Sequence, residues 1–168
     1  PSYFYSTNFI KEVDIAMYEA KALGRDGVIM FNKELAEKVE RHLLIEQKLH
    51  HALKEKQIKI YYQPQFDKDE NIIGCEALIR WEDSELGLLS PEEFIPIAES
   101  TGLILELGNY VLKETFNTLQ IWNGQGKVLK NFSINISIRQ LLYKPFVEEV
   151  ESLMKRYFST INLEQTIC

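Results

Sequence analysis

The stretch GCEALIRWED, Gly74–Asp83, predicts a β-strand that carries charge where a core strand would carry aliphatic side chains. Successive side chains of a strand point to opposite faces of its sheet. One face of this strand is apolar and consists of Cys75, Ala77 and Ile79. The opposite face is unusual and consists of Glu76, Leu78 and Arg80. The first face suits packing under helices, and the second needs a functional explanation.

Two further segments predict strands with the same alternation. IKIYYQ, residues 58–63, is expected to end at Pro64, and NFSINIS covers residues 131–137. Each has one apolar face, and each has a second face that becomes polar toward the C-terminal end. Gln63 occupies that position in the first strand and Asn135 in the second. We therefore expect a carboxylate, a guanidinium and two amides on one wall of the sheet.

Helical patterns separate most of these strands. Ser90 is placed as an N-cap, with Pro91 at the first helical position and Glu93 completing a capping box. Two more helices are predicted, over residues 104–123 and 145–160. Strands that alternate with helices predict an α/β fold of parallel βα units, and in a barrel of such units the site lies at the C-terminal ends of the strands. An antiparallel sheet with one solvated face would give the same alternation.

The N-terminal part has a different pattern. A helix is predicted from residue 10 to its end at Gly24, followed by a turn over residues 25–27 and a short apolar strand over residues 28–31. Residues 33–56 are strongly charged, without Gly or Pro, and predict a connecting helix between two units.

Composition narrows the class of function. The 168 residues suffice for an ordinary soluble domain, and the net charge of -6 argues against non-specific nucleic-acid binding. No apolar run approaches the ~20 residues of a membrane span. The chain has two cysteines, Cys75 and Cys168, and we expect no disulfide framework from them. This favours a reducing, cytoplasmic location. The spacing of His42, His50 and His51 suits surface residues rather than a metal site.

The residue types on the polar wall indicate phosphoester chemistry. The carboxylate of Glu76 and the amide oxygen of Asn135 are hard ligands suited to Mg²⁺ or Mn²⁺. The guanidinium of Arg80 could hold a phosphate through two parallel hydrogen bonds. An ion pair between Glu76 and Arg80 is the structural alternative.

Three segments together resemble the first half of an EAL domain, the family of cyclic di-GMP phosphodiesterases. They read YYQPQFD, IIGCEALIRWEDSELGLLSPEEFIPIAESTGLI and FSINISIRQL, and they occur in the family's order. VDIAMYEAKALGRDGVIMF is similar to the last helix and strand of a GGDEF domain, the cyclic di-GMP synthase family. The resemblance implies a GGDEF remnant over residues 1–32, the connecting helix over 33–56, and the first half of a TIM-like (β/α) barrel over 57–168.

The resemblance also implies roles for individual residues. Glu76 and Asn135 would be metal ligands, Leu78 and Arg80 would contact cyclic di-GMP with Arg80 on a phosphate, and Gln63 would line the pocket. EAL enzymes use two divalent cations to activate a water that opens one phosphodiester and yields linear pGpG. The implied ligand is cyclic di-GMP, the implied cofactor is Mg²⁺ or Mn²⁺, and a homodimer through the EAL domain or the connecting helix is left open.

Several motifs of both families are absent from the sequence. They include the Glu of the next EAL strand, the paired aspartates of DDFG, the later lysine and glutamate, and the GGDEF signature itself. We therefore expect a truncated piece of a longer GGDEF–EAL protein, inactive by itself and prone to self-association or disorder at its C-terminus. The longer protein could carry a membrane anchor upstream. The alternatives are a non-catalytic EAL-type receptor for cyclic di-GMP and a protein-interaction module.

Overall fold

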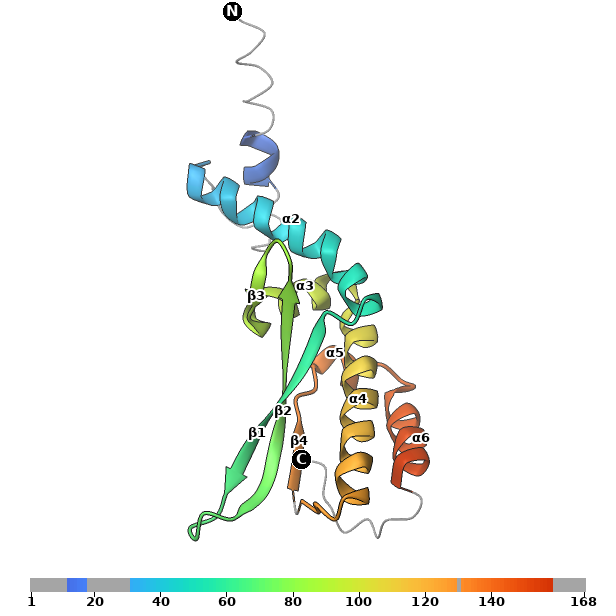
Figure 1. Cartoon of the computed structure of the whole chain (residues 1–168). Coiled ribbons are helices and arrows are strands. Elements are labelled where there is room, and N and C mark those ends of the chain that lie inside the picture. The colour runs from blue at the N-terminus through green and yellow to red at the C-terminus, as the bar shows by residue number, and fades with distance from the viewer. Residues whose placement is uncertain (1–11, 18–30, 130, 159–168) are drawn as a thin grey trace, which may run out of the picture. The chain divides into compact units, whose positions relative to one another are not determined.

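The Gly74–Asp83 stretch lies in the central strand of a sheet, β2 (Ile72–Asp83), as Figure 1 shows. The computed structural model describes residues 12–17, 31–129 and 131–158. Within them, β2 pairs with β1 (Ile58–Phe66), β3 (Gly87–Leu89) and β4 (Asn131–Ile134). The expected α/β fold is confirmed, with strands and helices in one unit.

The sequence predicted parallel strands, but β1 runs antiparallel to β2. β1 and β2 are antiparallel, and so are β2 and β3; β4 is the strand that runs parallel to β2. The connection from β1 to β2 is a tight turn in which Asp67 Oδ1 accepts the N–H groups of Asp69 and Asn71, each at 2.9 Å. A turn this short cannot make a parallel crossover, which needs a dozen or more residues.

The first strand also continues past Pro64, where the sequence predicted its end. Pro64 lies opposite Cys75 in the β1–β2 ladder, and β1 runs to Phe66. In the described sheet β1 has a strand neighbour on one side, β2. Such an edge strand tolerates a residue without an N–H group where that position faces away from the ladder.

The three predicted helices after β2 are confirmed. They are α3 (Pro91–Thr101), α4 (Ile104–Gly124) and α6 (Phe146–Phe158); a short α5 (Ile138–Leu141) and strand β3 were not predicted. α4 packs against β1 on one side and against α3, α5 and α6 (Figure 1). Gly102 ends α3 in the left-handed conformation, with φ of 83°, as its position after the predicted helix suggests.

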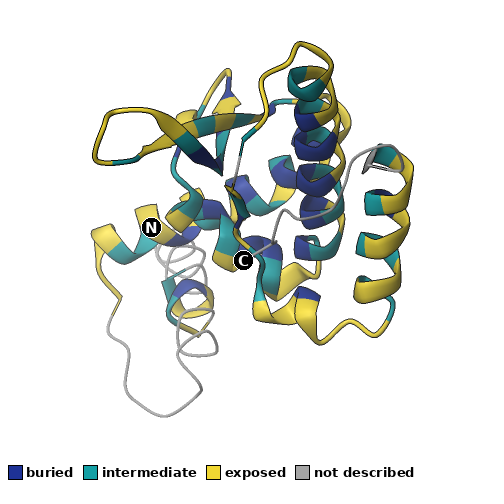
Figure 2. Cartoon of the chain, turned by 90° about the horizontal axis from the view of Figure 1, so that it is seen from below, coloured by how far each residue is buried: buried dark blue, intermediate teal, exposed yellow. Residues whose placement is uncertain are grey.

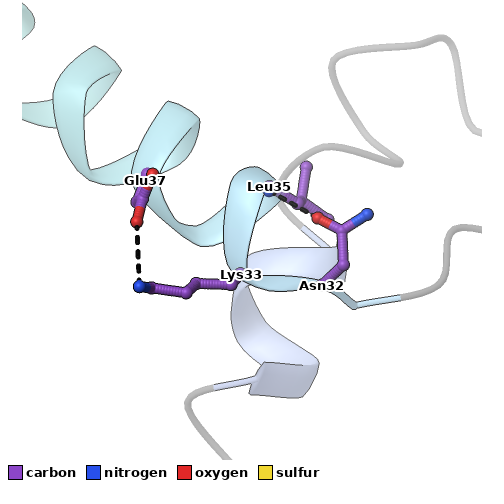
Figure 3. Close-up of polar contacts among 4 residues, drawn as sticks. All are labelled: Asn32, Lys33, Leu35 and Glu37. Atoms are coloured by element: carbon purple, nitrogen blue, oxygen red, sulfur yellow. Dashed lines mark hydrogen bonds and ion pairs between the residues drawn. The ribbon is translucent and has the colours of Figure 1, made fainter.

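The predicted connecting helix is present as α2 (Lys33–Lys54). Figure 3 shows how it begins: Asn32 Oδ1 accepts the N–H of Leu35 at 2.7 Å, and Lys33 Nζ lies 3.7 Å from a carboxylate oxygen of Glu37. The chain divides into two compact units between Lys48 and Leu49, within this helix.

The expected helix from residue 10 to Gly24 is helical over residues 12–17, and its remainder lies outside the described residues. Residues 28–30 of the expected short strand also lie outside them, and Phe31 is not in a strand. None of the described helices is both long and apolar enough to cross a bilayer.

The apolar strand faces form the core with the helices, as predicted. Cys75 and Ala77 of β2 and Ile134 of β4 are buried, and α4 buries its residues at helical spacing. The buried positions of α4 are Ile104, Leu107, Gly108, Val111, Leu112, Thr115, Phe116 and Leu119. In Figure 2 buried residues, drawn dark blue, gather along one side of a long helix, with exposed residues on the other.

We predict that the buried Cys75 thiol reacts slowly with alkylating reagents, because desolvation raises its pKa to about 11 from an ordinary value of 9.0. The thiolate is the nucleophile, so alkylation by iodoacetamide at pH 8 should be about 100-fold slower than for an unfolded thiol. Cys168→Ser leaves Cys75 as the single cysteine for this measurement. Equal alkylation rates with and without urea would contradict the prediction.

The same shift gives a pH dependence of stability. A raised pKa of an acid means that the folded state favours the neutral thiol. The unfolded chain ionises first as the pH rises, so the contribution of Cys75 to stability is present below pH 9 and declines between about pH 9 and 11.

Candidate functional site

Glu76, Gln63 and Asn135 come together at the polar face of the sheet. In the strand ladders Glu76 lies directly opposite Gln63 of β1 on one side and Ser133 of β4 on the other. Asn135 follows the last residue of β4, and its Nδ2 donates a hydrogen bond to Glu76 Oε1 at 2.7 Å. Gln63 and Asn135 are exposed and Glu76 is half-buried, so the group is open to a ligand.

Arg80 and Leu78 lie on the same face, farther along β2. Arg80 pairs in register with Lys59, four residues from the Glu76 position, which at ~3.3 Å per residue is about 13 Å along the strand. Its Nη1 donates to the carbonyl oxygen of Ile79 at 2.7 Å, which leaves other guanidinium N–H groups for a phosphate. Glu76 and Arg80 form no ion pair in the described part of the chain. An ion pair between them therefore does not explain these two charges.

A cavity of about 340 Å³ lies at the C-terminal end of β4, where the helix-facing side of the sheet meets α3 and α4. Its walls come from β2, α3, α4 and the loop after β4, and they are mainly apolar: Leu78, Ile79, Pro91, Ile95, Leu107 and Ile136. Asn135, Glu99, Ser137 and Gln140 also line the cavity and add polar groups. The cavity has the mainly apolar lining with a few polar groups that ligand pockets share, but it lies on the other side of β2 from Glu76 and Arg80.

Glu76 and Asn135 supply some of the ligands that one divalent cation needs. The hydrogen bond between Asn135 and Glu76 shows that both side chains reach a common point between β2 and β4. A cation there would take a carboxylate oxygen of Glu76 and, after the amide turns, Oδ1 of Asn135. Two ions need more carboxylates than Glu76 alone supplies, and among the described residues no three His, Cys, Asp or Glu side chains cluster as a metal site.

Tyr61 is a member of this face that the sequence argument did not single out. It lies opposite Leu78, and its hydroxyl donates to Glu82 Oε1 at 3.1 Å. The hydrogen bond to Glu82, and then the negative charge of that carboxylate, raise the pKa of Tyr61, whereas the charge of Arg80 lowers it. The alternation of β1 places Lys59, Tyr61 and Gln63 on one face, which was the available signal.

Comparison with known proteins places the chain in a family. The family model described as EAL domain matches residues 46–163. The chain is 34% identical over 145 residues, 86% of its length, to the bifunctional diguanylate cyclase/cyclic di-GMP phosphodiesterase MucR of Pseudomonas aeruginosa. It is 34% identical over 159 residues, 95% of its length, to the cyclic di-GMP phosphodiesterase PdeR of Escherichia coli.

A solved structure also resembles the described fold. The MucR phosphodiesterase in complex with c-di-GMP superposes with a TM-score of 0.68 at 32% identity, over 74% of this chain and 50% of that one. The chain spans only 21% and 23% of the length of the two curated relatives.

Proposed function

The chain belongs to the EAL domain family, and from this we propose that it binds cyclic di-GMP through the polar face of its sheet. The contact between Glu76 and Asn135 on the polar face of the sheet is the observation that carries the proposal. The name and the bound ligand of the MucR structure support the choice of ligand. In the whole protein we propose hydrolysis of one phosphodiester to linear pGpG, assisted by Mg²⁺ or Mn²⁺.

Each residue of the site then has a distinct role. Glu76 and Asn135 hold a divalent cation, which when bound supplies charge stabilisation and an activated water. Arg80 binds a phosphate, because its guanidinium offers several donors on the same face of β2 as Glu76. Leu78 contacts the ligand from β2, and Gln63 contacts it from β1.

The region before the EAL match is proposed to be the end of a GGDEF domain. The matches to MucR and PdeR cover 86% and 95% of the chain, more than residues 46–163 alone, and the MucR name includes a diguanylate cyclase. We keep the domain boundaries of residues 1–32, 33–56 and 57–168 as part of this proposal. Cytoplasmic location is proposed with it.

A non-catalytic receptor remains the second candidate. Glu76 and Asn135 contribute one carboxylate and one amide, which suffices to assist binding and not to hold two cations. We therefore propose that the 168-residue chain binds cyclic di-GMP without hydrolysing it, and that hydrolysis requires ligands in addition to these two. Hydrolysis by the whole protein distinguishes the enzyme from the receptor.

Calorimetric titration with cyclic di-GMP, with and without Mn²⁺, tests the proposal. Mn²⁺ should strengthen binding by the chain by roughly tenfold, about 1.4 kcal/mol, and should not strengthen binding by Glu76→Gln. Glu92→Gln is the matched control, because Glu92 is an exposed glutamate in α3. Chromatography of the same mixtures should detect no pGpG.

Two results would count against the proposal. Absence of cyclic di-GMP binding by the parent chain would remove the proposed ligand. Formation of pGpG by the chain would show that Glu76 and Asn135 need no further ligands.

A further inference from the structure

A second polar cluster, Glu99, Ser137 and Gln140, lies close to Asn135, because Ser137 follows Asn135 by two residues. Ser137 Oγ donates to Glu99 Oε1 at 2.5 Å, which joins the loop after β4 to the end of α3 across 38 residues of sequence. Ser137 and Glu99 are half-buried and Gln140 is 3% exposed. The cluster belongs to the polar end of the cavity, although none of its members is part of the proposed ligand set.

Ser137 is held by its backbone as well as by its hydroxyl. Its N–H donates to Gln140 Oε1 at 3.1 Å, and its Oγ accepts the N–H of Arg139 at 3.2 Å. The bond to Gln140 is one of the two bonds of a capping box at the start of α5. Because α5 has four residues, helix propensity alone could not hold it, and the bond to Glu99 supplies a tertiary anchor.

The Gln140 side chain is fixed from the other side by α4. It packs against Gly108, where an added Cβ would lie 1.8 Å from Gln140 Nε2 and 2.5 Å from its Cδ. Glycine is unfavourable in a helix interior, and here its missing side chain makes the space that the amide occupies. The first turn of α5 is therefore seated on α4.

The position of Glu99 is unfavourable within its own helix. It lies in the last turn of α3, which contains no basic residue, and a carboxylate there opposes the helix dipole. The hydrogen bond from Ser137 gives this carboxylate a tertiary role that the local sequence does not explain.

These contacts lie next to Asn135 in the chain. Ile134 pairs with Ala77 and is the last residue of β4, so the ladder holds the chain just before Asn135. Ser137 holds it two residues after. Between these two points the loop has little freedom to move the Asn135 side chain away from Glu76.

We infer that Glu99, Ser137 and Gln140 are positioning residues, which hold the loop after β4 so that Asn135 faces Glu76. The inference rests on the proposed function only in that the positioned pair is the proposed cation and ligand site. It predicts that the three residues affect ligand binding without touching the ligand.

Nuclear magnetic resonance of the ¹⁵N-labelled chain tests this without any ligand. The side-chain amide signals of Asn135 are identified by their loss in Asn135→Ala. In Ser137→Ala these signals should move toward those of an asparagine side chain that donates no hydrogen bond to protein, and their hydrogen exchange should rise up to about tenfold, the effect of one lost hydrogen bond. Ser137→Thr, which keeps the hydroxyl, should restore the parent signals.

Matched variants separate positioning from a general loss of stability. Ser100→Ala removes another hydroxyl of the same region, one that donates to the carbonyl of Ile97 within α3, and should leave the Asn135 signals unchanged. Glu99→Gln weakens the Ser137 bond more mildly and keeps the test available if Ser137→Ala fails to fold. Unchanged Asn135 signals in folded Ser137→Ala or Glu99→Gln would overturn the inference.

A cyclic di-GMP titration of the same variants adds the link to function. Ser137→Ala should weaken binding by roughly fivefold, and Ser100→Ala should not. If the parent chain does not bind, the proposed function fails, and the Asn135 signals still decide whether the cluster positions the loop. If binding is unaffected although the signals move, the cluster does not serve the ligand site and the inference is overturned.

Discussion

Trp81→Ala is expected to lower the free energy of unfolding by about 3–5 kcal/mol. Trp81 is 0% exposed and lies in register between Ile58 of β1 and Leu89 of β3. Its ring meets that of Phe94 edge-on, with centroids 5.7 Å apart, and its indole N–H donates to Gln57 Oε1 at 3.3 Å. Truncation would leave a cavity where two strands and α3 meet, and it would remove the hydrogen bond to Gln57.

Urea unfolding followed by circular dichroism measures this loss as a shift of the midpoint. Trp81→Phe should cost less, because it keeps an aromatic ring against Phe94. Ile72→Ala is a control at the exposed start of β2, where the side chain is 56% exposed, and it should change stability by less than about 1 kcal/mol. A loss below 1 kcal/mol for Trp81→Ala would show that this residue does not organise the core.

Arg80→Ala is expected to weaken cyclic di-GMP binding by roughly 10- to 100-fold. A hydrogen bond to a charged group contributes about 1.5–3 kcal/mol, and each 1.4 kcal/mol is a factor of ten. Arg80→Lys should fall in between, because an ammonium keeps the charge and loses the fork of parallel donors. Fluorescence polarisation with labelled cyclic di-GMP at two salt concentrations measures both effects.

Arg156→Ala is the matched control for this prediction. It makes the same change in net charge, on the exposed face of α6, where Arg156 lies against its neighbour Tyr157. Its effect on binding should be small and should vanish at higher salt, since only long-range attraction is lost. Equal losses for Arg80→Ala and Arg156→Ala would show that Arg80 acts through net charge and holds no phosphate.

Glu76 and Asn135 illustrate how far sequence reasoning reached into the site. The alternation of β2 and of the third predicted strand placed both side chains on one wall, and the structure joins them by a hydrogen bond of 2.7 Å. The same argument offered an ion pair between Glu76 and Arg80, which the described chain does not form. Alternation assigns a side chain to a face, and it does not give the distance between two side chains on that face.

By itself the sequence determined the features that depend on near neighbours. The faces of β2, the start of α3 at Ser90 and its end at Gly102 follow from strand alternation, capping and backbone freedom, which act over a few residues. The motifs around Glu76 and Asn135 were also sufficient to indicate the EAL family, which the match to residues 46–163 shows.

Only the tertiary structure decided the existence of β3 and α5 and the contact of Ser137 with Glu99. The direction of β1 follows from the tight turn after Phe66, which is a local feature, whereas the alternating pattern of β1 is the same in either direction. Gly108 has room for Gln140 because α4 and α5 meet there, and Glu99 has a partner because α3 ends beside the loop after β4. Such contacts join residues tens of positions apart, so they depend on how the helices pack and not on any local pattern.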